Sequence, residues 1–152
     1  FEIYDHLLAP ILDRLEADTR FEGIGIFYDR RDDEIVESNV MPAINYFLQP
    51  DWEDITRGSN TASLRDRRLT VNIGFGIWAF DTNKGRLDRA LFHIAGNLID
   101  WLRENTEFDR TNGVAVVGAI RWTPVEGFGD DNNLVGCQKI VAGFELYSGA
   151  GI

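Results

Sequence analysis

A strand-like segment at residues 68–80 runs into a helix-like segment at 86–103, and this pair most constrains the fold. In the first segment every second residue is apolar, as expected for a strand with one buried face. These residues are Leu69, Val71, Ile73, Phe75 and Ile77. In the second segment apolar residues recur every three or four positions, the period of an amphipathic helix. They are Leu87, Ala90, Leu91, Ile94, Leu98, Trp101 and Leu102. We therefore predict a half-buried strand whose inner face is covered by the helix that follows it.

One more helix and four more strands are expected. Residues 2–20 carry an apolar helical stripe, in which Pro10 either kinks the helix or occupies the first turn of a shorter helix that starts near Ala9. The expected strands are residues 23–28, 40–48, 114–122 and 134–147. Pro42 lacks the N–H that a sheet ladder needs, so it belongs near the start of its strand or on a sheet edge.

The remaining segments are polar and show little periodicity. Four segments are therefore expected to be connections, namely 29–34, 51–67, 105–112 and 126–133. The loop at 51–67 is long for a compact domain, and loops of that length are commonly functional or disordered.

The order of these elements predicts the fold class. A chain of 152 residues is normally one domain, so residues 1–152 are taken as a single domain. Runs of adjacent strands favour antiparallel pairing, and helices that bracket them pack on one face. We expect an α+β fold with a mostly antiparallel sheet of four to five strands and two helices on one face.

Two parts of the chain are candidates for contact with other subunits or partners. The outer face of the 68–80 strand holds Trp78 and Phe80 beside Gly74 and Gly76, and such an aromatic face is expected to meet a neighbour. The 51–67 loop and the residue after it hold basic side chains and one tryptophan in an otherwise acidic chain. The candidate contact residues are Trp52, Arg57, Arg65, Arg67, Arg68, Trp78 and Phe80. The alternative for the loop is a solvated connection.

Charge and composition disfavour several classes of protein. The formal net charge of −10 disfavours nucleic-acid binding, because affinity for the phosphate backbone comes from Lys and Arg. The single cysteine, Cys137, leaves no pair for an internal disulfide or a multi-cysteine zinc site and fits a small strand residue. A membrane partner is not expected, because no apolar run reaches the ~18 residues of a membrane-spanning helix.

A catalytic signature is missing from the sequence. His6 and His93 have no partner at metal-ligand spacing, and the motifs of serine hydrolases and phosphate-binding loops are absent. Residues 127–133 are rich in oxygen donors but lack the spacing of a calcium-binding EF-hand loop, so a solvated hairpin tip is expected. We therefore expect no catalytic residue, metal or cofactor.

The element order resembles that of the tail-terminator, or tail-completion, proteins of tailed bacteriophages, and of related neck and minor tail proteins. The resemblance covers almost the whole chain and depends on layout. It comprises a leading amphipathic helix, the Pro-containing strand 40–48, the alternating strand 68–80, the helix 86–103 and two closing strands that end at 142–147. The loops at 51–67 and 124–133 depart from a compact version of this layout.

The resemblance implies a structural virion protein that is not an enzyme. Its subunits would form a homo-oligomeric ring, commonly a hexamer, that caps the tail tube and joins it to the head-side connector. The implied partners are the tail tube protein and the neck or connector proteins. Assembly in the host cytoplasm and a final location in the virion are implied as well. DNA would pass through the channel without specific binding, which suits an acidic surface.

Two alternatives remain open. Within the same class, the chain is a head–tail connector, neck or other minor tail protein. From a different class, it is a small α+β enzyme or ligand-binding domain with a pocket between sheet and helices.

Overall fold

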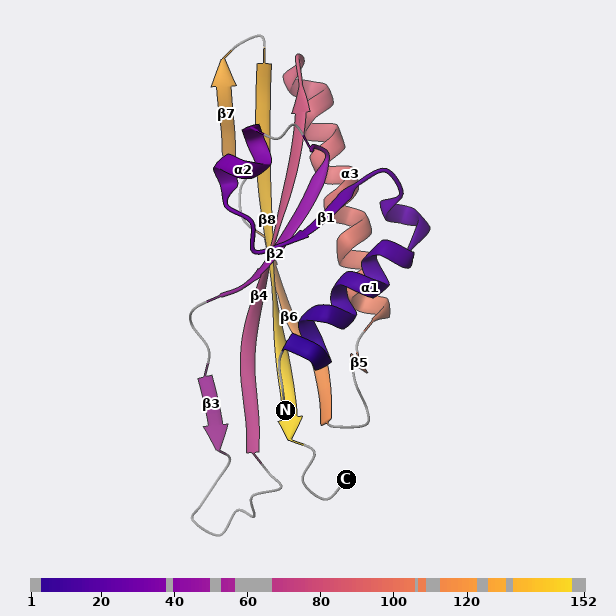
Figure 1. The fold of residues 1–152 in the computed structure, drawn as a ribbon, viewed down its shortest axis with the longest axis vertical. Coiled ribbons are helices and arrows are strands. Elements are labelled where there is room, and N and C mark those ends of the chain that lie inside the picture. The colour runs from indigo at the N-terminus through magenta and orange to yellow at the C-terminus, as the bar shows by residue number, and fades with distance from the viewer. Residues whose placement is uncertain are drawn as a thin grey trace.

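A mixed, mostly antiparallel β-sheet forms the centre of the computed structural model, which describes residues 4–37, 40–49, 53–56, 67–105, 107–108, 113–122, 126–130 and 133–148. The strands of these segments follow the order β1-β2-β4-β8-β6-β5, with β3 beside β4 and β7 beside β8 (Figure 1). Only β1 and β2 run parallel among these pairs of described strands. The strands are β1 (Gly25–Tyr28), β2 (Ala43–Leu48), β3 (Glu53–Thr56), β4 (Arg67–Asp81), β5 (Glu107–Phe108), β6 (Gly113–Trp122), β7 (Glu126–Asp130) and β8 (Asn133–Ser148). The predicted α+β class with a mostly antiparallel sheet is confirmed.

The described helices are of three kinds. They are the π-helix η1 (Tyr4–Leu8), the α-helices α1 (Ala9–Ala17), α2 (Asp32–Glu37) and α3 (Lys84–Glu104), and the 3₁₀-helix η2 (Thr19–Phe21). Pro10 lies in the first turn of α1, where its missing N–H costs no helical hydrogen bond. Each of the two interpretations of residues 2–20 is therefore right in part: helical backbone runs without a gap from Tyr4 to Ala17, and its α-helical part starts at Ala9.

The five strands expected from the sequence are present as β1, β2, β4, β6 and β8. Three short strands add to them, so the sheet of the described residues has eight strands rather than four to five. β3, β5 and β7 lie in segments that were expected to be loops, at 51–67, 105–112 and 126–133, and have only 4, 2 and 5 residues. Each pairs along a longer strand, and that tertiary pairing creates the strand, since the short segments carry little alternation of their own.

The longest pairing in the sheet joins β4 to β8. Their register runs without interruption from Arg68 opposite Tyr147 to Asp81 opposite Leu134. β6 pairs along the other side of β8, with a shift in register between Val117 and Ile120 that marks a β-bulge. β8, the last of the described strands, therefore lies in the interior of the sheet.

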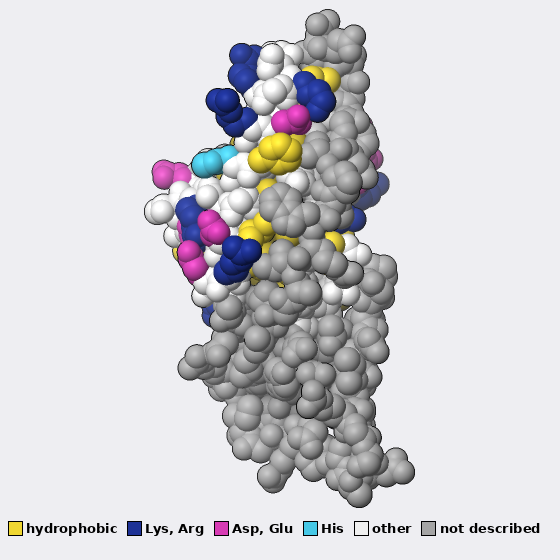
Figure 2. Space-filling model, turned by 180° about the vertical axis from the view of Figure 1, so that it is seen from behind, with side chains coloured by type: hydrophobic (Ala, Val, Ile, Leu, Met, Phe, Trp, Pro, Cys, Tyr) yellow, Lys and Arg dark blue, Asp and Glu magenta, His cyan; other side chains and the backbone are white. Residues whose placement is uncertain are grey.

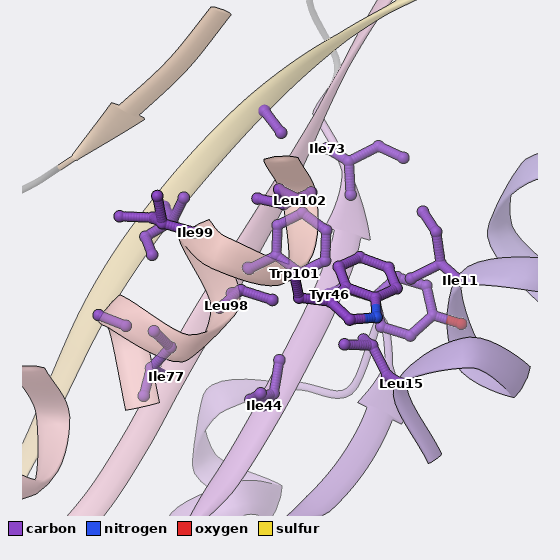
Figure 3. Packing of buried hydrophobic residues seen from close by; sticks show 14 of the residues in the cluster. Ile11, Leu15, Ile44, Tyr46, Ile73, Ile77, Leu98, Ile99, Trp101 and Leu102 are labelled. Atoms are coloured by element: carbon purple, nitrogen blue, oxygen red, sulfur yellow. The ribbon is translucent and has the colours of Figure 1, made fainter. Parts of the chain in front are cut away.

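α1 and α3 lie on one side of the sheet and α2 on the other (Figure 1). The buried residues of α1 and α3 share one core with β2, β4 and β8. In this core Trp101 of α3 points toward Tyr46 of β2 and toward Ile11 and Leu15 of α1 (Figure 3). The Tyr46 hydroxyl donates a 2.9 Å hydrogen bond to the Leu8 carbonyl, and burial raises the pKa of this phenol. The hydrogen bond satisfies the polar end of an otherwise apolar contact.

The predicted amphipathic helix is confirmed as α3, slightly longer than expected. The Asn83 side chain caps it by accepting a 3.0 Å hydrogen bond from the Arg86 N–H. Its apolar stripe is buried against the sheet, where Leu91 lies over Gly136 of β8. A methyl group added at Gly136 would stand 2.8 Å from Leu91 Cδ1, so this glycine permits the close approach of helix and strand.

Arg20 joins the segment after α1 to the end of α3. Its guanidinium donates to Asp18 at 2.7 Å and to Glu104, the last residue of α3, at 2.6 Å. The hydrogen bonds from Arg20 hold the pKa of Asp18 below its ordinary value of 3.8. Arg20 thereby links its segment to a residue 84 positions away.

Neighbouring residues of α3 with opposite burial give a direct test of the core. Leu91→Ala should lower the free energy of unfolding by about 2–5 kcal/mol, because it removes a fully buried side chain and leaves a cavity over Gly136. Phe92→Ala, at an exposed position, should change it by about 0.5 kcal/mol or less. Urea unfolding followed by circular dichroism measures both. Equal effects of the two variants would contradict the assignment of the helix face.

The Arg20 link predicts a dependence of stability on pH. Because the pKa of Asp18 is depressed in the folded state, its contribution is present above the ordinary carboxyl pKa of 3.8 and is lost as the pH falls through the depressed value. The wild type should therefore melt at a higher temperature than Asp18→Asn at pH 7, and the gap should narrow toward about pH 3. Thermal unfolding across this range measures the gap. A gap independent of pH would show that the Asp18 charge contributes nothing.

Candidate functional site

The basic residues predicted as contacts are only partly placed. Trp52, Arg57 and Arg65 lie outside the described residues. Arg67 and Arg68 do not belong to a loop: they are the first two residues of β4, paired with Thr56 and Ile55 of β3. The expectation that Arg67 lies in the 51–67 connection is therefore wrong, because the strand begins one residue earlier than predicted and β3 pairs with it.

Trp78 is also a correction. It is only 3% exposed and belongs to a small cluster with Ile35, Ala43 and Val135. The expected open aromatic face is closed here by α2, which occupies part of a segment predicted to be a charged connection at 29–34. Trp78 is thus part of the chain's own core and is not available to a neighbouring subunit. Phe80, two residues further along β4, remains 46% exposed and keeps its candidate role.

The glycines beside Trp78 make room for aromatic rings of the same chain. A methyl group at Gly74 would stand 2.6 Å from the Phe47 ring, and one at Gly76 would stand 3.2 Å from Trp78 Nε1. Phe47 is paired with Gly74 in the β2–β4 register, and Lys139 lies 5.3 Å from the centre of its ring. Rings that cover strand glycines in this way protect the backbone at those positions. The middle of this face is therefore covered from within the chain.

A buried amide holds α2 in its place. Asn45 of β2 accepts a 3.0 Å hydrogen bond from the Arg30 N–H and donates a 2.8 Å hydrogen bond to the Arg30 carbonyl. The preceding residue, Asp29, has a φ of 51°, a conformation that Asp tolerates better than most residues. Together they turn the chain out of β1 and into α2. Ile35, fully buried, then packs α2 onto the Trp78 cluster.

The outer side of α2 and the end of β4 form the first candidate surface. Val36 is 37% exposed, and Phe80 is paired with Val135, a member of the cluster beneath α2. Acidic side chains surround these apolar groups. We define the α2 surface as Asp32, Asp33, Val36, Glu37 and Phe80, all exposed. Residues 29–37 contain five acidic and two basic side chains, so this surface is negative.

The outer side of α3 forms the second candidate surface. Figure 2, seen from behind, shows Lys and Arg side chains together with hydrophobic and some acidic ones in the upper part of the molecule, where Figure 1 places α3. We define the α3 surface as the exposed residues Lys84, Arg86, Arg89, Phe92 and His93. Phe92 is 52% exposed. The segment 84–93 contains three basic side chains and one acidic one, on a chain whose net charge is −10.

The charges of the α3 surface are engaged to different degrees. Lys84 pairs with Asp88 at 3.0 Å, and Arg86 pairs with Asp81 at 3.1 Å. Hydrogen bonds, first from the Asn83 N–H and then from Arg86, lower the pKa of Asp81. Arg89 is exposed and forms no ion pair or hydrogen bond within the part of the chain that the structure describes. Its guanidinium can therefore bind another molecule without giving up a contact to any described residue.

Metal ligands do not gather anywhere in the described segments. No cluster of three or more His, Cys, Asp or Glu residues with metal-binding geometry occurs among the described residues. His93 is exposed on α3, with Asn97 3.4 Å away. None of the helices in the described segments has both the length and the apolar character needed to cross a membrane.

One deeply buried polar atom lies on the helix-covered side. The side-chain Oε1 of Gln138 in β8 accepts no hydrogen bond from any described residue. A buried acceptor left in this state costs stability, on the order of 1–3 kcal/mol. It lies opposite Ile77 in the β4–β8 register, beneath the helical layer.

Comparisons with known proteins give no family. No protein-family model matches the chain. No curated protein matches it either. The two surfaces are therefore interpreted from their own chemistry.

The burial of Trp78 and the exposure of Phe80 lead to a paired prediction. Trp78→Ala should destabilise the fold by about 3–5 kcal/mol, since it removes a large side chain from the cluster beneath α2. Phe80→Ala should change stability by no more than about 1 kcal/mol, because the ring is already half in water. Chemical unfolding of both variants measures the difference. A Trp78→Ala variant as stable as the wild type would show that α2 does not cover this tryptophan.

Proposed function

We propose that this chain is the subunit of a homo-oligomeric ring and that the ring is a tail terminator of a tailed bacteriophage. The ring would cap the tail tube and present a surface to the head-side connector. The observation that carries the proposal is the pair of exposed surfaces on opposite sides of the sheet. The α2 surface is acidic and the α3 surface is basic, and each contains at least one exposed apolar side chain.

A closed ring requires such a pair. In a cyclic assembly larger than a dimer each subunit uses two different patches, one for each neighbour, and the contact is heterologous. A subunit with one self-complementary patch would stop at a dimer. Surfaces of opposite charge on opposite sides of one sheet favour the ring over the dimer.

The length of the central strands agrees with this role. β4 and β8 remain paired over fourteen positions, which span about 45 Å at the usual rise per residue. α3 has 21 residues and spans about 31 Å. Figure 1 shows β4, β6 and β8 extending beyond the helices at one end of the molecule. The uncovered strands give a subunit the reach to contact a partner along the ring axis.

The charge of the chain suits a ring through which DNA passes. A net charge of −10 repels the phosphate backbone, so an acidic lumen would not retain the passing genome. The small basic segment on α3 is the exception. Its position on the outer side of a helix fits contact with a protein neighbour.

The oligomeric state tests the proposal. Purified protein, analysed by size-exclusion chromatography with light scattering and by negative-stain electron microscopy, should form rings of one size, because a heterologous contact with a fixed rotation between neighbours closes after a set number of copies. Added to polymerising tail-tube subunits, these rings should stop elongation and sit at the tube end. Phe92→Ala should stay folded and assemble less well, because it removes an exposed apolar side chain from the α3 surface.

Two results would contradict the proposal. A chain that remains monomeric at every concentration, both alone and with tail tubes, would favour a small enzyme or ligand-binding domain. Rings that bind a connector ring and ignore tube ends would instead assign the chain to the neck.

A further inference from the structure

The α3 surface has the composition of a protein contact site. Arg89 precedes Phe92 by three positions and His93 by four, so its side chain neighbours both on the helix surface. Phe92 is the most exposed of the large hydrophobic side chains on α3 among the described residues. Aromatic rings and arginines are the side chains that contribute most to protein–protein contacts. The matching partner should offer an apolar group flanked by acids.

The α2 surface has this composition with the opposite charge. Asp33 precedes Val36 by three positions and Glu37 by four, the same spacing as Arg89, Phe92 and His93. Phe80, opposite Val135 of the cluster beneath α2, adds a second exposed apolar side chain. The two helices therefore present one apolar side chain and two ionisable ones in the same geometric order. On α2, Asp33 and Glu37 occupy the positions that Arg89 and His93 occupy on α3.

We infer that the α3 surface of one copy docks onto the α2 surface of the next copy, with Phe92 against Val36 and Phe80, and Arg89 facing Glu37. This inference rests on the proposed ring, for which it names the contact. A second copy of the chain is the occupant because both complementary surfaces belong to the same polypeptide.

The net charge strengthens the choice of these two surfaces. Two copies of a chain with net charge −10 repel each other over most of their surfaces. Close approach is favoured only where opposite charges meet, and the segment 84–93 carries an excess of positive charge. Pairing it with the acidic residues 29–37 brings opposite local charges together. Electrostatic complementarity of this kind selects the partner and its orientation.

The position of the two surfaces makes the contact heterologous. α2 lies on one side of the sheet and α3 on the other (Figure 1). A copy docked through its α2 surface therefore leaves its own α3 surface free for the next copy. Such a series closes into a ring when the rotation between neighbours permits it.

A charge-exchange experiment tests this contact. Arg89→Glu should weaken ring formation about tenfold or more, because it sets like charges against each other across the interface. Glu37→Lys should have the same effect, and its position at the end of α2 tolerates a positive charge. Sedimentation velocity measures the assembly, and thermal unfolding verifies that each variant is folded. Arg103→Glu, with the same change of charge on α3 but outside the α3 surface, should assemble like the wild type.

Mixing the two variants gives the decisive measurement. In a mixture of the Arg89→Glu and Glu37→Lys variants, every contact between unlike copies is attractive. At one interface the introduced carboxylate at position 89 meets the introduced ammonium at position 37, and at the next the native Arg89 meets the native Glu37. The mixture should therefore form rings that neither variant forms alone, with the two chains alternating. The double variant should form rings by itself.

Each outcome separates the contact from the proposed function. If the wild type forms rings and Arg89→Glu forms them equally well, the proposed contact is wrong and the proposed ring still stands. Loss of the ring in Arg89→Glu without rescue in the mixture overturns the pairing with the α2 surface. A wild type that never assembles overturns both the contact and the ring.

Discussion

The pairing of β4 with β8 is the constraint on which the rest of this fold depends. β4 is buried on both faces from Ile73 to Ala79, and each face is covered in a different way. The odd-numbered residues of this stretch lie under α1 and α3. On the other face, the rings of Phe47 and Trp78 pack over Gly74 and Gly76, and α2 covers Trp78. Beyond this stretch Phe80 reaches solvent as an apolar group, and it contributes to the α2 surface.

The parts of the fold that could be predicted are the helices and strands whose periodic pattern continues over enough residues to be recognised. β4 alternates from Leu69 to Ile77 and α3 repeats its apolar stripe from Leu87 to Leu102, so each pattern specifies both an element and its buried face. β3, β5 and β7 have too few residues for a pattern, and they exist because a long strand offers them an edge. α2 was not predicted for a related reason. Its six residues contain four acids and only two apolar side chains, so they resemble a solvated loop.

The error over Trp78 as a candidate contact follows from that missed helix. Without α2, the face that holds Trp78 and Phe80 looks uniformly open, whereas α2 buries the first and leaves the second exposed. Phe92 and Arg89 were not singled out, because polar residues on the outer side of an amphipathic helix are ordinary. The available signal was Phe92 itself, a large aromatic residue that falls off the apolar stripe of α3. The predicted roles of Trp52, Arg57 and Arg65 stay predictions, since these residues lie outside the described segments.

The interior position of β8 has a consequence for the order of events during synthesis. Sequence separations between β4 and β8 run from 53 residues at one end of their ladder to 79 at the other. Such distant pairing must wait until residues 134–147 have left the ribosome, and high contact order slows folding. Until then β4 and β6 both display unsatisfied edges, which are prone to pair with other chains. β8 thus completes the sheet by inserting between β4 and β6. A nascent chain is therefore most dependent on chaperones just before this strand emerges from the ribosome.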